Sequence, residues 1–292
     1  MYKYKIFNNI AEAGIRIFLD NNFILDEANP DALMLRSKVL SNQDLTDSLY
    51  CIGRAGAGTN NIPIEEATKK GIVVFNTPGA NANAVKELVV CGMLLASRGI
   101  IQGNIYSQSL SGQDSEELNK SMEAQKKSFK GNELKGKTLG IIGLGSIGSL
   151  LAQTAEVMGM KIIGYDPYIS IDAAWRLPKD VEKADSMKML LSNSDYISIH
   201  VPLVKDTKDL INKESLKFFK KGSKLINLSR GGIVNNEDIV EALNSKIIEK
   251  FVTDFPTPEL VSRSNDFQDV ILLPHLGAST NEAEENCAVM AA

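Results

Sequence analysis

The sequence predicts an α/β fold with two doubly wound parallel-sheet domains. Short β-branched runs alternate with helix-length amphipathic segments in two series, one before residue 77 and one after residue 137. The length of 292 residues fits two domains of roughly 150 residues each. Because a crossover follows each strand, we expect the strands to run parallel and helices to cover both faces of each sheet.

Composition narrows the classes of function. Apolar residues make up 43% of the chain and charged residues 23%, as in ordinary globular domains. The formal charge of −4 provides no basic field, so we expect no nucleic-acid partner. The longest apolar run, Leu88–Ala96, is about half a membrane span, and the N-terminus leads into no signal-peptide core. We therefore expect a cytoplasmic protein with no membrane partner.

The three cysteines are Cys51, Cys91 and Cys287. They form no CxxC pair and have no histidine nearby, so they predict neither a disulfide framework nor a metal site. We expect all three to be small buried residues.

The first series predicts a domain over residues 1–97. A helix is expected at Ile10–Leu19, and a second over Ile62–Gly71, where Pro63 suits a first helical position and Gly71 ends the helix. An Ala-rich helix is expected from Ala82 to about Ile101. The expected strands are Tyr4–Phe7, Ala32–Arg36, Leu49–Arg54 and Ile72–Phe75.

The polar stretch Gln102–Lys137 separates the two series and is expected to be the inter-domain crossover. It can be a disordered linker or a partly helical excursion. The helical spacing of Leu118, Met122 and Gln125 favours the excursion.

The second series predicts a domain over residues 98–280, and residues 281–292 can return to the first domain. Six parallel strands make a complete doubly wound sheet. They are expected at Leu139–Ile142, Lys161–Tyr165, Tyr196–His200, Lys224–Leu228, Lys250–Thr253 and Val270–Leu273.

A glycine-rich turn from Gly143 to Gly148, GLGSIG, follows a predicted strand and opens a helix over Ile147–Met158. This context gives the GxGxxG pattern its meaning. Gly143 permits a tight turn, Gly145 lets the backbone approach a pyrophosphate, and Gly148 lets the helix pack on the strand. The helix N-terminus supplies free N–H groups, so the sequence predicts a dinucleotide site.

Asp166 ends the next predicted strand, where a carboxylate can bond the ribose 2′-hydroxyl and would repel a 2′-phosphate. This favours NAD over NADP as the cofactor of a Rossmann-type domain. Alternatively, the glycines form only a packing turn and Asp166 caps the loop before Pro167.

The chain has two histidines, His200 and His275, and both end predicted strands of the second series. Ligands bind at that edge of an open α/β sheet, although a histidine there is often structural. Arg230 and Asp254 end two further strands, and Glu259 follows five residues later. Arginine, glutamate and histidine can therefore converge on one crevice.

These segments together resemble the NAD-dependent D-2-hydroxyacid dehydrogenase family, and within it the phosphoglycerate dehydrogenase branch. The resemblance covers nearly the whole chain. The motifs that carry it are RAGAG at 54–58, NTPGANAN at 76–83, GLGSIG at 143–148, HVPL at 200–203, LSRGG at 228–232, DF at 254–255 with Glu259, and PHLGAST at 274–280.

The resemblance implies a flavodoxin-like substrate domain, a Rossmann NAD domain and a homodimer formed through the NAD domain. It implies the reversible oxidation of 3-phosphoglycerate to 3-phosphohydroxypyruvate, which begins serine biosynthesis. One alternative is another acid, as in a hydroxypyruvate or glyoxylate reductase or a D-lactate-type dehydrogenase. Another is an NAD-sensing corepressor-like binding protein, because a fold does not determine a function.

By resemblance, Arg230 would hold the substrate carboxylate, His275 would exchange the proton, and Glu259 would orient the imidazole. Histidine suits a proton exchange that runs in both directions near neutral pH. Asp254 is similar to the family's contact with the nicotinamide carboxamide. The remaining cofactor contacts would be Gly143, Gly145, Ser146, Ile147, Gly148, Asp166, His200, Val201, Pro202 and Thr207.

Further substrate contacts are expected in the first domain, at Arg54, Ala55, Gly56 and Asn76. Arg54 and the N–H groups of residues 55–57 form a turn suited to an anion, and Asn76 can hydrogen-bond the substrate. Alternatively, Arg54 forms a surface salt bridge beside a tight turn.

Two positions depart from the family's usual pattern. Asn60 stands where relatives carry Asp, and Leu260 stands where a Pro follows the catalytic Glu. The sequence stops at Ala292, where relatives continue, so we expect a truncated form or a chain whose remainder is not included.

Overall fold

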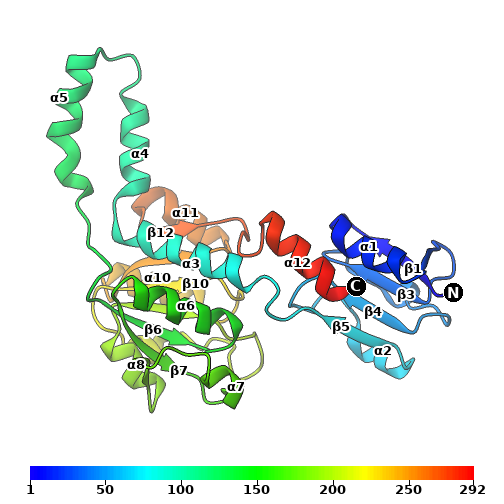
Figure 1. Ribbon diagram of the computed structural model, residues 1–292. Helices are drawn as coiled ribbons and strands as arrows, with labels where there is room; N and C mark the ends of the chain where they lie inside the picture. The colour runs from blue at the N-terminus through cyan, green and yellow to red at the C-terminus, as the bar shows by residue number, and fades with distance from the viewer. The chain divides into compact units, whose positions relative to one another are not determined.

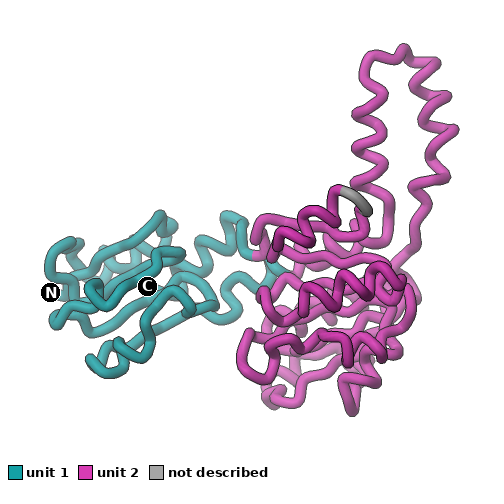
Figure 2. The backbone as a smooth tube through the Cα atoms, turned by 180° about the vertical axis from the view of Figure 1, so that it is seen from behind, with its two compact units in different colours: residues 1–85, 278–292 teal, residues 86–277 magenta. Residues whose placement is uncertain are grey.

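The computed structural model describes the backbone of all 292 residues and every side chain except those of residues 266 and 267. The chain forms two compact units, unit 1 with Met1–Val85 and Ala278–Ala292, and unit 2 with Lys86–Gly277. Figure 2 shows them in two colours. Each unit is built on one parallel sheet, which confirms the predicted fold class.

Unit 1 contains a five-stranded parallel sheet in the order β2-β1-β3-β4-β5. This is the flavodoxin-like strand order. The two-residue strand β2 was not predicted, because two residues carry no periodic pattern. The strands are β1 (Lys3–Phe7), β2 (Ile24–Leu25), β3 (Ala32–Leu35), β4 (Cys51–Arg54) and β5 (Val73–Asn76).

Alternate residues of β3 enter two different apolar clusters of unit 1. Ala32 and Met34 belong to the cluster that includes α1 and α12, whereas Leu33 and Leu35 belong to the cluster that includes α2. The sheet therefore has a covered core on both faces, as a doubly wound fold requires. The helices are α1 (Glu12–Asp20), η1 (Asn42–Asp44), α2 (Ile64–Lys69) and α12 (Asn281–Ala291).

The last helix, α12, belongs to unit 1 because it packs closely on α1. A Cβ at Gly14 would lie 2.7 Å from the carbonyl oxygen of Ala288, so the helices meet backbone to backbone. Arg36 adds an ion pair to Glu284 at 2.5 Å. The return of the C-terminal residues to the first unit begins at Ala278.

Unit 2 contains a seven-stranded parallel sheet in the order β12-β11-β10-β9-β6-β7-β8. The order is that of a dinucleotide-binding sheet with one added strand, and it reverses between β6 and β9. The prediction of six strands missed β8, whose two residues are both exposed. The strands are β6 (Thr138–Ile142), β7 (Lys161–Tyr165), β8 (Glu182–Lys183), β9 (Tyr196–Ile199), β10 (Ser223–Asn227), β11 (Ile248–Thr253) and β12 (Val270–Leu272).

The division between the units falls at residue 85, not at residue 97 as the sequence suggested. The reason is the packing of α3: a Cβ at Gly92 would lie 3.1 Å from Val252 of β11, so this helix lies on the second sheet. The helices of unit 2 are α3 (Ala82–Ser97), α4 (Ile100–Ser109), α5 (Ser115–Gln125), η2 (Lys126–Phe129), α6 (Ser146–Val157), α7 (Ile171–Ala174), α8 (Met187–Asn193), α9 (Lys213–Leu216), α10 (Asn236–Asn244) and α11 (Pro258–Phe267).

The polar stretch after α3 forms a hairpin of two helices, α4 and α5, that projects from unit 2 (Figure 1). Asp114 caps α5 by accepting hydrogen bonds from the N–H groups of Glu116 and Glu117. Tyr106 packs against Phe129 with ring centroids 5.5 Å apart, which ties the hairpin to its base. The segment is thus a helical excursion and not a disordered linker.

Cys287 is buried, Cys51 is half-buried and Cys91 is exposed on α3, so the expectation that all three cysteines are buried holds only for Cys287. In the part of the chain that the structure describes, no helix is both long and apolar enough to span a membrane.

Candidate functional site

The glycine-rich turn joins β6 to α6 and divides its three glycines between two tasks. Gly143 has φ of 92°, and a Cβ there would lie 2.6 Å from the carbonyl oxygen of His200. A Cβ at Gly148 would lie 2.1 Å from the carbonyl oxygen of Gly143. A Cβ at Gly145 would meet nothing within 4 Å. The outer glycines therefore permit packing, whereas the middle one faces the open space that a bound ligand needs.

The amino end of α6 provides the electrostatics for an anion. The N–H groups of Ser146 and Ile147 have no acceptor among the residues that the structure describes. Unpaired N–H groups and the positive end of the helix dipole favour a phosphate at this position.

Asp166 follows β7 and contacts the glycine-rich turn directly. Its carboxylate accepts hydrogen bonds from the N–H groups of Leu144 and Tyr168, both at 2.9 Å. The carboxylate thus caps the loop as the alternative interpretation supposed. Two carboxylate oxygens offer about four acceptor positions, so ribose hydroxyls can still bind.

A cavity of about 400 Å³ lies beside Asp166. Its walls are mainly apolar, as a site for a flat heterocyclic ring requires. They include Leu144, Tyr165, Pro167, Ile169, Val181 and Ala184.

His200 follows β9 at the position where the strand order reverses. Its Nε2 lies 2.8 Å from the Ser198 hydroxyl, and its Nδ1 is buried with no partner among the described residues. Burial lowers the pKa of the His200 imidazole to about 4. The ring is therefore neutral near pH 7 and unsuited to donate a proton in catalysis.

The residues after His200 form a closed loop. The Thr207 hydroxyl donates to the Pro202 carbonyl at 2.5 Å and accepts from the Val204 N–H at 2.8 Å. Val201 is half-buried and packs against the core of unit 2. The predicted cofactor contacts at residues 200–207 thus form one compact loop next to the glycine-rich turn.

Asp254 lies at the carboxyl end of β11 and is 1% exposed. Its Oδ2 accepts the Gly277 N–H at 3.2 Å, whereas its Oδ1 is buried and has no partner among the described residues. Burial raises the pKa of the Asp254 carboxyl, and the Gly277 N–H and the charges of His275 and Arg230 oppose this rise. The orphaned oxygen fits an amide donor such as the nicotinamide carboxamide.

His275 and Arg230 lie near Asp254, at the ends of β12 and β10. The His275 N–H donates to the Asp254 carbonyl at 3.2 Å, and the imidazole lies edge-on to Phe255 with ring centroids 5.1 Å apart. Arg230 Nη1 donates to the Ser229 carbonyl at 2.6 Å. The structure thus brings three of the predicted site residues to adjacent strand ends of one sheet.

Glu259 occupies the first turn of α11 and is exposed. Hydrogen bonds from its own N–H and from the Thr257 hydroxyl lower the pKa of its carboxyl, so Glu259 is ionised near neutral pH. Among the described side chains, no hydrogen bond or ion pair joins Glu259 to His275. The structure therefore does not bring the predicted pair into contact.

The predicted substrate residues of unit 1 lie at the ends of β4 and β5. Arg54 Nε donates to the Arg36 carbonyl at 3.2 Å. Asn76 Nδ2 donates to the Ala57 carbonyl at 2.7 Å. The first bond ties the end of β4 to the residue after β3, and the second holds the turn at residues 55–58 against the end of β5.

Two of the backbone donors expected to bind an anion already have partners. The Ala55 N–H donates to the Leu35 carbonyl and the Gly56 N–H to the Arg54 carbonyl, both at 2.8 Å. These two N–H groups are therefore already engaged within the fold.

Two cations that follow β3, Arg36 and Lys38, were not predicted as site residues. Because β3 and β4 are neighbours in the sheet, these cations lie at the same sheet edge as Arg54. The signal in the sequence is a basic residue, Arg36, directly after the apolar run Ala32–Leu35.

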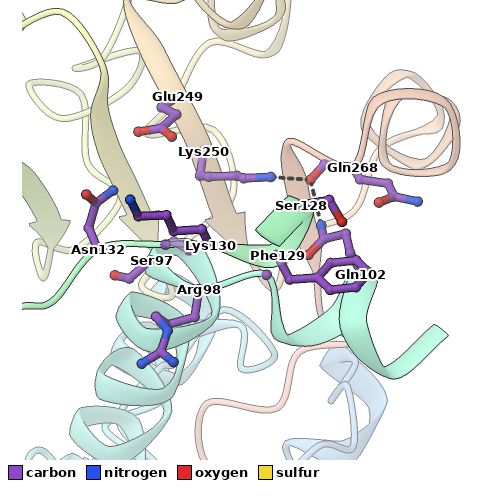
Figure 3. Close-up of a pocket in the computed structure, with 13 residues that line it drawn as sticks. Ser97, Arg98, Gln102, Ser128, Phe129, Lys130, Asn132, Glu249, Lys250 and Gln268 are labelled. Carbon is purple, nitrogen blue, oxygen red and sulfur yellow. Dashed lines mark hydrogen bonds between the residues drawn. The ribbon is translucent and has the colours of Figure 1, made fainter. Parts of the chain in front are cut away.

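Another hollow, of about 280 Å³, lies at the base of the helical hairpin (Figure 3). It includes Lys250 near the amino end of β11, away from the strand ends that carry Arg230 and Asp254. The side chains that the structure describes contain no group of ligands suited to a metal ion.

These features are typical of two-domain α/β proteins that bind a dinucleotide on one of two parallel sheets, at the point where the order of its strands reverses. Residues 93–277 match the family model described as the D-isomer specific 2-hydroxyacid dehydrogenase, NAD binding domain. The chain belongs to the D-isomer specific 2-hydroxyacid dehydrogenase family. The cofactor expected from the glycine-rich turn is thereby confirmed as NAD.

Three similar proteins illustrate the relationship. The chain is 37% identical to a D-3-phosphoglycerate dehydrogenase of Synechocystis over 97% of this chain and 50% of that one. It is 38% identical to a hydroxypyruvate reductase of Thermotoga maritima over 89% of this chain and 81% of that one. The NAD⁺-bound 3-phosphoglycerate dehydrogenase of Entamoeba histolytica superposes with a TM-score of 0.76 and 27% identity, covering 99% of this chain and 92% of that one.

The chain spans about half the length of the phosphoglycerate dehydrogenases from Synechocystis, Bacillus subtilis and Methanocaldococcus jannaschii that it matches.

Proposed function

We propose that the protein is an NAD-dependent dehydrogenase that interconverts 3-phosphoglycerate and 3-phosphohydroxypyruvate. The observation that carries the proposal is the grouping of Arg230, Asp254 and His275 at adjacent strand ends of the NAD-binding unit. The similarity to D-3-phosphoglycerate dehydrogenases supports the choice of substrate.

The residues of unit 2 suit each part of this reaction. Arg230 binds the substrate carboxylate, because a guanidinium matches a carboxylate with two parallel hydrogen bonds. His275 removes the proton from the 2-hydroxyl in oxidation and returns it in reduction. The ionised Glu259 stabilises the imidazolium once its side chain turns to His275. NAD, when bound, accepts or supplies the hydride at C2 of the acid.

The residues of unit 1 supply positive charge for an acid that carries a phosphate. The side chains of Arg36, Lys38 and Arg54 lie at the carboxyl ends of β3 and β4. Arg36 is ion-paired with Glu284, so Lys38 and Arg54 supply the positive charge at this sheet edge, which suits a substrate with a phosphate better than it suits pyruvate or glyoxylate. This observation favours the phosphorylated acid among the family's substrates.

The test compares NADH oxidation by the purified protein with phosphohydroxypyruvate, hydroxypyruvate, glyoxylate and pyruvate. The proposal predicts the highest kcat/KM for phosphohydroxypyruvate. A Lys38→Gln variant should lose this preference, whereas Lys69→Gln, on the exposed end of α2, should keep it. Equal kcat/KM for the phosphorylated and unphosphorylated acids would refute the choice of substrate.

A second candidate is hydroxypyruvate reduction, which the similarity to the Thermotoga maritima enzyme favours. The same assay separates the two, because this candidate predicts a kcat/KM for hydroxypyruvate above that for the phosphorylated acid. NADH binding without turnover of any acid would instead favour an NAD-sensing binding protein.

The proposal includes a homodimer formed through unit 2, with the α4–α5 hairpin as the contact. Neither helix of the hairpin has a buried residue, and Ile100 and Ile105 are about half exposed. A second copy of the chain would cover these apolar side chains. Analytical ultracentrifugation should detect a dimer that a variant lacking residues 107–128 loses. If the deletion variant still sediments as a dimer, the hairpin is excluded as the contact.

A further inference from the structure

A buried ion pair ties α11 to the start of β12. Arg263 Nε and Nη2 donate to the two carboxylate oxygens of Asp269 at 2.9 and 2.8 Å. The side chains are 7% and 5% exposed. Arg263 Nη1 also donates to Asn244 Oδ1, at the end of α10, at 2.8 Å. Three donors of one guanidinium thus fix the helix to two other elements.

The two partners lie on the elements that carry the proposed catalytic residues. Arg263 stands one helical turn after Glu259, about 6 Å along the axis of α11. Asp269 precedes the strand that leads to His275.

The path from Asp269 to His275 is held along its length by β11. The Asp269 carbonyl accepts the Phe251 N–H at 3.0 Å. Further along, the Leu273 N–H donates to the Thr253 carbonyl at 3.0 Å, and the His275 N–H donates to the Asp254 carbonyl at 3.2 Å. The backbone of His275 is therefore fixed relative to Asp269. Because Asp269 is paired with Arg263, the ion pair also fixes α11 relative to the backbone of His275.

Besides the ion pair, α11 is held by one side-chain bond to β12, from the Ser264 hydroxyl to the Val270 carbonyl at 3.0 Å, and by contacts at its two ends. Leu260 is 1% exposed in the core of unit 2 and fixes the first turn at one point. At the other end, Lys250 Nζ donates to the Gln268 carbonyl at 2.6 Å (Figure 3). A guanidinium fork adds direction to these contacts, because its two parallel bonds hold only in one geometry.

We propose that Arg263 and Asp269 are positioning residues that set the distance from Glu259 to His275. The inference rests on the proposed function, in which the Glu259 carboxylate turns to the His275 imidazole. Without the fork, α11 keeps its core contact at Leu260 and the single bond from Ser264 to Val270 but loses the two parallel bonds that set its direction, so the carboxylate no longer reaches the imidazole in the required geometry. A displacement of about 1 Å at a reacting group can cost about a hundredfold in rate.

The first test is the kinetics of two variants that treat the pair differently. Arg263→Lys keeps the charge but loses the fork and the bond to Asn244. The double variant Arg263→Met/Asp269→Leu removes both charges together, which protects the fold because neither is left buried alone. Both should lower kcat about 10- to 100-fold, with KM and NADH affinity unchanged. Wild-type kcat in the double variant would overturn the proposal.

The matched control is Lys224→Met. Lys224 is also 7% exposed and pairs with Glu249 at 2.8 Å in the same unit, but it joins neither Glu259 nor His275. This variant should lower Tm while kcat stays at the wild-type value. A loss of kcat equal to that of Arg263→Lys would show that any broken ion pair of this unit impairs turnover, and would overturn the specific role.

The second test is a double-mutant cycle with Glu259→Gln. If Arg263 acts through Glu259, then Arg263→Lys has no further effect on kcat in the Glu259→Gln background. If the double variant instead lost the product of the two single-variant factors in kcat, Arg263 would act independently of Glu259, which contradicts the proposal.

The third readout needs no turnover and so separates this inference from the proposed function. The chain has two histidines, so the proton NMR spectrum holds two imidazole C2–H signals, and His275→Gln assigns them. Arg263→Lys should shift the His275 signal in the same direction as Glu259→Gln does. An unmoved signal in Arg263→Lys overturns the positioning role. Failure of every acid in the turnover assay overturns the proposed function and leaves this comparison intact.

Discussion

Alanine substitutions at Gly145 and Gly148 can test separately how the cofactor turn packs and how it binds a ligand. The backbone of Gly145 has φ of −69°, which alanine adopts freely, and its Cβ would meet nothing within 4 Å. At Gly148, a Cβ would lie 2.1 Å from the Gly143 carbonyl oxygen and 3.2 Å from Ile141 Cγ2. Gly148→Ala therefore forces the strand and helix apart, whereas Gly145→Ala changes only the surface that faces the cofactor.

The expected magnitudes differ in kind. Overpacking at residue 148 costs about 1–3 kcal/mol, which lowers Tm by about 2–12 °C for a unit of this size. At residue 145 the fold should be unchanged within about 1 kcal/mol. The methyl group there would instead hold a pyrophosphate away from the N–H groups of the turn. A lost hydrogen bond to a charged group is worth about 1.5–3 kcal/mol, or about 10- to 150-fold in Kd.

Calorimetry and NADH fluorescence titration measure the two effects on the same samples. Gly145→Ala should keep the wild-type Tm and lose NADH affinity, and Gly148→Ala should lose Tm. An equal fall of Tm in both variants, or wild-type NADH affinity in Gly145→Ala, would refute the division of tasks within the turn.

Three further predictions concern single side chains of unit 2. His275→Gln should lower kcat by about 10²–10⁴-fold while NADH affinity is kept, and wild-type turnover would contradict its role in proton transfer. Asp166→Ala removes the carboxylate that would repel a 2′-phosphate, so the ratio of kcat/KM with NADH to that with NADPH should fall; an unchanged ratio counts against this residue as the selector. Because burial lowers the pKa of His200 to about 4, the unfolded state takes up a proton between about pH 6.5 and 4 that the folded state refuses. The free energy of unfolding should thus be constant above about pH 6.5 and fall by roughly 3 kcal/mol at most as the pH drops to about 4. Urea titrations of wild type and His200→Gln check this, and the same pH dependence in both would show that His200 is not its source.

Local patterns were sufficient for much of the fold and for the centre of the site. The strand, glycine turn and helix around Gly143 were predicted from neighbouring residues, because a strand needs only its alternation and a tight turn only its glycine. The nearness of Arg230, Asp254 and His275 to one another was predicted because parallel strands bring their carboxyl ends to one edge, so that a residue's position at a strand end already implies its place.

Other features depend on contacts between distant segments. The predicted boundary at residue 97 was displaced because α3 packs through Gly92 on Val252, a contact across 160 positions. The partners of the Ala55 N–H and of the Asp166 carboxylate are backbone groups of other elements, which no local pattern specifies. Arg36 was not predicted to lie beside Arg54 because that position depends on the pairing of β3 with β4.

The order of elements, the dinucleotide turn and the residue types at the strand ends follow from local patterns, since each rests on interactions within a few residues. Folding was needed to assign each helix to its unit, to bury His200 Nδ1, and to join α11 through Arg263 to the strand before His275. These depend on burial and on hydrogen-bond geometry between segments that meet only when the chain is folded.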